Sequence, residues 1–128
     1  MCIRILEPGF NVTVQDLGRA SFQHLGVPVS GAVSPVALKI GNALVGNTPG
    51  VACLEIRLVG PTIEVLCDAI RVSLTGTITE IELIGENGRC QPANQSLVLK
   101  KGQKFRIGTI SDSGSAYLAI EGGFQLPE

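Results

Sequence analysis

Hydrophobic and polar residues alternate along most of the chain, in short runs that glycine and proline interrupt. The runs are rich in Val, Ile, Leu and Thr, and a period of two is typical of strands with one buried face. The pattern predicts about eight or nine strands. They lie within residues 2–6, 11–16, 52–60, 62–67, 70–76, 79–85, 96–108 and 116–124. So many short strands favour a closed or nearly closed barrel, because closure removes sheet edges.

Two of these segments give more detailed predictions. Residues 96–108 are interpreted as a hairpin that turns at Lys101-Gly102, with the nearby lysines solvated rather than forming a phosphate site. In residues 52–60, Leu54, Ile56 and Leu58 share one face of the strand. Glu55 and Arg57 then lie on the other face.

One segment, about residues 34–46, breaks the alternation and predicts a short helix. Ser34 stands at the N-cap, Pro35 at the first helical position and Gly46 just past the end. Each residue type suits its place: the Ser oxygen accepts a free backbone N–H, Pro has no N–H to lose there, and Gly adopts the left-handed conformation. The apolar residues at helical spacing, which we expect to pack into the core, are Val36, Ile40 and Ala43/Leu44.

Length and charge narrow the class of protein. The 128 residues fit a single domain spanning residues 1–128, and the formal net charge is −1. Basic residues are scattered, so no nucleic-acid partner is expected. No run of eighteen apolar residues suggests a membrane span, and the N-terminal residues lack the apolar segment of a signal peptide. A cytoplasmic location is therefore the expectation.

The four cysteines, Cys2, Cys53, Cys67 and Cys90, stand far apart with no CxxC pair, and the chain has one histidine. A metal site needs clustered ligands, so none is expected. Buried free thiols, behaving as small hydrophobic residues, are the preferred interpretation, because disulfides are rare in the cytoplasm.

The polar segment at residues 15–32, QDLGRASFQHLGVPVSGA, holds most of the candidate chemistry. Asp16 and Arg19 can form a turn around Gly18, or line a site. His24, between apolar neighbours, can be a hydrogen-bonded structural residue or a proton carrier. Ser30 precedes a glycine but lacks the GxSxG context of a hydrolase nucleophile. Residue by residue, both the structural and the functional interpretation stay open.

Ordered motifs go further than single residues. The strings are VQDLGR (14–19), QHLGVPVSGA (23–32), LVGN (44–47), Leu54-Glu55 and AYLAIEGG (116–123). Together they resemble the N-terminal part of the biotin-dependent carboxyltransferase family that includes allophanate hydrolase subunit 2. Relatives are the C subunit of 5-oxoprolinase, the carboxyltransferase region of urea carboxylase, and a regulator that antagonises a sporulation kinase inhibitor. The resemblance covers nearly the whole chain and implies a cyclophilin-like β-barrel corresponding to the first half of a longer protein.

The resemblance also implies an activity. The chain would be a subunit or fragment of an ATP-dependent 5-oxoprolinase, a hydrolase, or of a urea carboxylase-type carboxyltransferase acting on an amide or lactam. It would be inactive alone and work with proteins of the allophanate hydrolase subunit 1 type, or with proteins like the B and A subunits of 5-oxoprolinase. It would bind no cofactor alone, with ATP or carboxybiotin entering in the complex. Candidate catalytic residues are Asp16 and His24; candidate substrate-binding residues are Gln15, Arg19 and Ser30.

The alternative is a non-catalytic module that binds a partner protein, or a regulatory module that antagonises a kinase inhibitor. Ser34 stands where the family usually has Asp before the Pro, and Ser115-Ala116-Tyr117 replaces a common Arg-Ala-Tyr run. A cyclophilin-like peptide binder or isomerase is less favoured, because the chain has 4% aromatic residues and no Trp to build a proline pocket.

Overall fold

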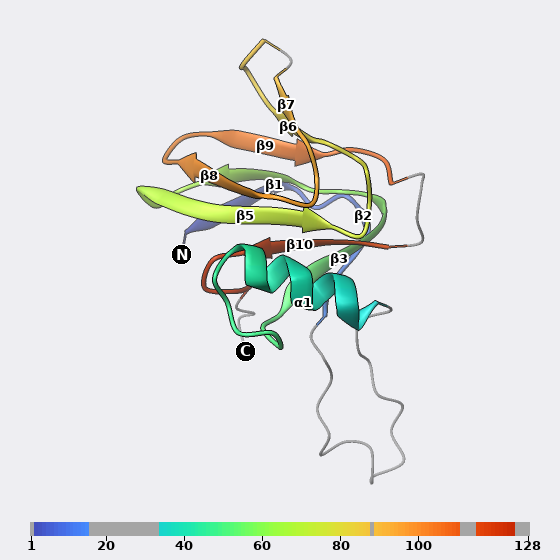
Figure 1. Cartoon of the computed structure of the whole chain (residues 1–128). Coiled ribbons are helices and arrows are strands. Elements are labelled where there is room, and N and C mark those ends of the chain that lie inside the picture. Colours follow the sequence, from blue (N-terminus) through green and yellow to red (C-terminus); the bar gives the residue numbers. More distant parts are fainter. Residues whose placement is uncertain (1, 16–33, 88, 111–114, 125–128) are drawn as a thin grey trace, which may run out of the picture.

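Two antiparallel five-stranded sheets and a helix make up the described part of the protein, as the computed structural model shows (Figure 1). The structure describes residues 2–15, 34–87, 89–110 and 115–124. The expected mainly β fold with a short helix is confirmed. Sheet A has the order β1-β4-β9-β6-β7 and sheet B the order β2-β3-β10-β5-β8.

The strand bounds follow the alternating runs closely. Sheet A contains β1 (Ile3–Glu7), β4 (Thr62–Val65), β9 (Lys104–Ile107), β6 (Ile81–Leu83) and β7 (Cys90–Gln91). Sheet B contains β2 (Phe10–Gln15), β3 (Cys53–Val59), β10 (Ala116–Ile120), β5 (Ala69–Thr75) and β8 (Ser96–Lys100). The two-residue strand β7 was not predicted, because Cys90–Gln91 is too short to show a period.

The sheets form a barrel-like sandwich rather than a closed barrel. In the described part of the chain, the two ladders meet only at an isolated bridge between Val59 and Thr109. Nearby, Gly60 N–H donates to the Gly108 carbonyl at 3.2 Å, where the chain leaves β3 for β4. The approach is close: a Cβ on Gly60 would lie 2.5 Å from the Ile107 Cβ. Only glycine therefore fits at this corner.

The predicted hairpin over residues 96–108 is wrong. β8 pairs with β5 in sheet B, whereas β9 pairs with β4 and β6 in sheet A. The turn at Lys101-Gly102, with Gly102 at φ +89°, carries the chain from one sheet to the other. Both strands place apolar side chains in the core between the sheets. The two strands bury these side chains by facing each other across the core, which pairing within one sheet would not allow.

Two hydrophobic cores lie on the two faces of sheet B. The main core fills the space between the sheets and includes Leu54, Ile56, Leu74, Phe105 and Leu118. The second core lies between sheet B and α1 (Pro35–Leu44). It consists of Ala37, Leu38, Val45, Cys53, Tyr117 and Ala119. Figure 1 shows the helix lying across the outer side of this sheet.

The helix boundaries are as predicted. Ser34 is the N-cap, and its hydroxyl oxygen accepts from the Ala37 N–H at 3.3 Å. Pro35 opens the helix, Val45 is the C-cap, and Gly46 follows at φ +80°. Local capping chemistry was enough to place this element.

The predicted buried face of the helix is wrong. Val36 and Ile40 are 66% and 49% exposed, whereas the face containing Ala37, Leu38, Gly41 and Asn42 is buried. Small residues on that face let the backbone approach sheet B closely. Two sheet hydroxyls then reach helix carbonyls: Ser73 Oγ donates to Gly41 O at 2.9 Å, and Thr75 Oγ1 donates to Ala37 O at 2.8 Å.

The prediction of buried free thiols is fully correct for one cysteine. Cys53 is buried under α1, and that burial raises the pKa of its thiol to about 12. Cys2 and Cys90 are exposed and Cys67 is half-buried, so these three are not core residues. All four are free. Cys2 directly precedes the edge strand β1 and Cys90 begins the edge strand β7, so both lie at the borders of sheet A.

Two further observations concern the described residues. No group of three or more His, Cys, Asp or Glu side chains among them is placed to hold a metal ion. No helix in the described part of the chain is both long and apolar enough to span a bilayer.

Candidate functional site

Four of the five predicted site residues, Asp16, Arg19, His24 and Ser30, lie outside the described residues. The fifth, Gln15, is the last residue of β2, and its Nε2 donates to Thr13 Oγ1 at 3.1 Å. Gln15 thus has an amide at the edge of sheet B, and its role in binding stays a prediction.

A row of polar residues crosses the outer face of sheet B. Thr13 on β2 lies opposite Glu55 on β3, Glu55 lies opposite Tyr117 on β10, and Tyr117 lies opposite Thr75 on β5. Directly opposed residues in an antiparallel sheet point to the same face. The row therefore lies on the side that α1 partly covers.

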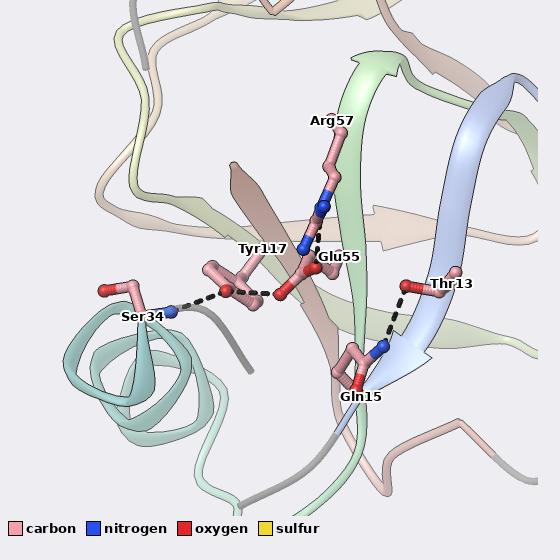
Figure 2. Close-up of polar contacts among 6 residues, drawn as sticks. All are labelled: Thr13, Gln15, Ser34, Glu55, Arg57 and Tyr117. Carbon is pink, nitrogen blue, oxygen red and sulfur yellow. Dashed lines mark hydrogen bonds and ion pairs between the residues drawn. The ribbon is translucent and has the colours of Figure 1, made fainter. Parts of the chain in front are cut away.

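A hydrogen-bonded network forms at the centre of this row (Figure 2). The Tyr117 hydroxyl donates to Glu55 Oε2 at 2.5 Å and accepts from the Ser34 N–H at 2.8 Å. Arg57 Nε donates to Glu55 Oε1 at 3.1 Å. A single carboxylate thus connects the helix N-cap, through tyrosine, to an arginine on its own strand.

Burial makes this carboxylate unusual. Glu55 is 1% exposed and Tyr117 is fully buried. A carboxylate removed from water is destabilising unless charge and hydrogen bonds compensate it, and here both oxygens have a donor. The face opposite the main core, which sequence patterning marks only as polar, is therefore a second interior at this position.

Arg57 differs from the other paired arginines. Described residues form three more Arg–Glu ion pairs, Arg4–Glu64, Arg89–Glu86 and Arg106–Glu82, and in each the carboxylate side chain is at least partly exposed. Only Arg57 is held by a buried carboxylate, while its own side chain is 51% exposed. Among described residues, only Nε of its guanidinium has a protein partner.

This arrangement can bind a planar anion. Glu55 restrains the guanidinium through Nε, so that less side-chain entropy is lost when a ligand binds. The two terminal nitrogens can donate two parallel hydrogen bonds to a carboxylate, a geometry that arginine provides and lysine does not.

The network also lies at both ends of the segment that carries the predicted site residues. Residues 16–33 follow Gln15, which bonds to Thr13 beside Glu55. They precede Ser34, whose N–H bonds to Tyr117. The observed network and the predicted residues are therefore adjacent along the chain at two points.

Comparison with known proteins decides the family. The model of the carboxyltransferase domain, subdomain A and B, matches residues 25–128. This chain belongs to that family. The resemblance inferred from the motifs is thereby confirmed.

Individual relatives agree. Urea amidolyase of Saccharomyces cerevisiae is 31% identical over 127 residues, covering 98% of this chain and 7% of that protein. The C subunit of 5-oxoprolinase from Escherichia coli is 34% identical over 125 residues, covering 98% of this chain and 39% of that protein. The crystal structure of Kluyveromyces lactis urea carboxylase superposes with a TM-score of 0.88 at 30% identity, covering 99% of this chain and 11% of that one. The chain thus spans well under half of each of these carboxyltransferase-family relatives.

Sequence reasoning missed the roles of Glu55, Arg57 and Tyr117. A glutamate and an arginine at alternate positions of a strand look like a solvated face. A usable signal was Tyr117, the only tyrosine, inside the apolar run AYLAI. A buried tyrosine hydroxyl usually has a hydrogen-bond partner, so the position of Tyr117 predicts a polar group on a neighbouring strand.

Proposed function

We propose that this carboxyltransferase-family chain contributes part of the substrate site of an enzyme. That enzyme would resemble either a biotin-dependent carboxyltransferase or the 5-oxoprolinase that contains a C subunit of this family. Its substrate would be an amide or lactam, such as 5-oxoproline or a urea-type compound. The observation that carries the proposal is the half-exposed Arg57 guanidinium held by the buried Glu55. The names of the relatives, urea amidolyase and the C subunit of 5-oxoprolinase, support the substrate class.

In this proposal Arg57 binds the carboxylate of a lactam substrate such as 5-oxoproline. For a lactam that carries a carboxylate, the two terminal nitrogens take the two oxygens, which fixes the orientation of the amide bond. Glu55 and Tyr117 are positioning residues, because they act on the substrate through Arg57 and through the chain at Ser34. Asp16 and His24 remain the proposed acid–base residues, with Gln15, Arg19 and Ser30 as further binding groups.

Partner proteins complete the enzyme. The chain covers 39% of a protein named as one subunit of 5-oxoprolinase, so the remaining chemistry lies elsewhere in the assembly. We assign ATP or carboxybiotin to partners that resemble the A and B subunits of 5-oxoprolinase. The sequence has neither a GxxxxGK[ST] phosphate loop nor a biotin-carrier lysine motif, which supports that division.

Co-expression with A-type and B-type 5-oxoprolinase subunits tests the proposal, with ATP-dependent cleavage of 5-oxoproline as the assay. Arg57→Ala is expected to raise KM by about 10- to 100-fold, since a charge-assisted bond contributes about 1.5–3 kcal/mol. Arg106→Ala is the matched control, because Arg106 is 49% exposed and also pairs with a glutamate. Equal kinetics in the two variants would contradict the role of Arg57. The enzymatic function would be contradicted if the complexes assemble but show no turnover in any combination of subunits.

A non-catalytic partner-binding module is the second candidate. The outward face of α1 favours it, because Val36 and Ile40 are large apolar side chains that lie exposed one turn apart. This function would be supported instead of the first if the complex forms but shows no turnover, and if Ile40→Asp abolishes complex formation while the chain stays folded.

A further inference from the structure

The end of the β1–β4 ladder brings two cysteines together. Ile3 pairs with Val65, and just beyond this pair the Cys2 carbonyl accepts two N–H groups. Leu66 N–H donates to it at 2.7 Å and Cys67 N–H at 3.4 Å. Two residues on one strand opposing one on its partner is the pattern of a β-bulge, so Cys67 lies across from Cys2.

The spacing suits a disulfide. Opposed residues of antiparallel strands have Cα atoms about 4.5–5.5 Å apart, within the roughly 4.4–6.8 Å range that disulfides span. The thiols also interact. A hydrogen bond with the Cys2 side chain is the main cause that raises the pKa of the Cys67 thiol above its usual value, and partial desolvation is the second. Cys2 is exposed and Cys67 half-buried, so an oxidant in solvent can reach the pair.

We propose that Cys2 and Cys67 form a reversible disulfide when a peroxide is present, and that this bond fastens the edge strand β1 to β4. The exposed Cys2 thiolate attacks one oxygen of hydrogen peroxide, which gives a sulfenic acid and releases hydroxide. The Cys67 thiolate then attacks the Cys2 sulfur and displaces the hydroxyl group as water. Two thiols and one peroxide thus yield one disulfide and two waters, and a thiol reductant reverses the step.

The bond would stabilise the fold. β1 is an edge strand that pairs, among the described strands, only with β4. A link between residues 2 and 67 closes a long loop of the unfolded chain and lowers its entropy, so oxidation is expected to raise Tm by about 10 °C. Reduction returns β1 to its ordinary edge-strand stability.

The other two thiols are internal controls. Cys53 is buried beneath α1 and is not accessible. Cys90 is exposed, as Cys2 is, but it belongs to β7, at the opposite edge of sheet A from β1. Exposure alone therefore predicts modification of Cys90, whereas proximity predicts that only Cys2 and Cys67 become joined.

Peptide mapping tests the proposal on the full chain. The purified protein is treated with hydrogen peroxide, its remaining thiols are alkylated, and trypsin is added without reductant. Each cysteine falls in its own peptide, and the expected product joins the peptide ending at Arg4 to residues 58–71. Cys67→Ser should abolish both that product and the rise in Tm, while Cys90→Ser should retain both. Absence of the product in wild type, dominant disulfide-linked dimers, or an unchanged Tm after it forms would each overturn the proposal.

Discussion

Replacing Tyr117 with Phe removes one oxygen atom from the polar network and leaves the buried ring in place. That oxygen donates to Glu55 at 2.5 Å and accepts from the Ser34 N–H at 2.8 Å. The substitution opens no cavity in the core beneath α1, so its effect comes from two polar groups that each lose a partner.

The magnitude follows from what those groups lose. A hydrogen bond to a charged group contributes about 1.5–3 kcal/mol, and the half-buried Ser34 N–H, which water can partly serve, adds about 1 kcal/mol. The two losses share one atom and are not additive, and relaxation around the half-exposed Arg57 recovers part of them. We expect Tyr117→Phe to lower the free energy of unfolding by about 3 kcal/mol.

Urea denaturation measures this loss. With an m-value of about 1–3 kcal/mol/M, the midpoint should fall by about 1–3 M. Thr13→Val is the control, because it deletes an exposed hydroxyl from the same row of the same sheet and should cost less than about 0.5 kcal/mol. A double-mutant cycle with Glu55→Gln then measures the coupling between the two residues. A cost for Tyr117→Phe no larger than that of Thr13→Val would refute the network as a stabilising element.

Three further predictions concern the frame around the site. Gly60→Ala should destabilise by about 2 kcal/mol or more in urea, because its Cβ would press on Ile107, whereas Gly108→Ala meets open space and should be tolerated. Asn42→Ala should cost about 2–4 kcal/mol in the same assay, since its buried amide donates to two loop carbonyls. The raised pKa of Cys53, about 12 against 9.0, means that the folded state holds this proton more tightly. The contribution of this thiol to the free energy of unfolding is complete below pH 9 and is lost as pH rises towards 12, by at most roughly 1.4 kcal/mol per pH unit. In Cys53→Ala this decrease of the free energy of unfolding with pH should be absent.

The helix shows what local sequence can and cannot predict. Its ends depend on Ser34, Pro35 and Gly46, each of which acts on neighbouring backbone groups, so the boundaries could be read directly. Its buried face depends on Ser73 and Thr75 in a strand far away along the chain. Large apolar residues usually mark the buried face, but here close approach of backbone to sheet favours the small ones.

Sheet membership was also beyond the alternating pattern. A period of two assigns residues 96–100 and 104–107 to strands and says nothing of which strands they join. A short turn between two strands favours a hairpin, yet Leu99 and Phe105 fill one core from opposite sheets. Hydrophobic burial between the two sheets outweighed hairpin pairing here, and this burial depends on the topology of the whole fold.

The same limit applies to the candidate site, because strand pairing brings together residues that lie far apart in the sequence. Motifs predict Asp16, Arg19 and His24 as site residues within one continuous segment. The structure identified Glu55 and Tyr117, which are separated by 62 positions in the chain and meet only through strand pairing. Both sets of residues are connected through Gln15 and Ser34, the residues on either side of the segment. A change at Glu55 therefore reaches Ser34 through Tyr117, although no local pattern distinguishes this carboxylate from a surface charge.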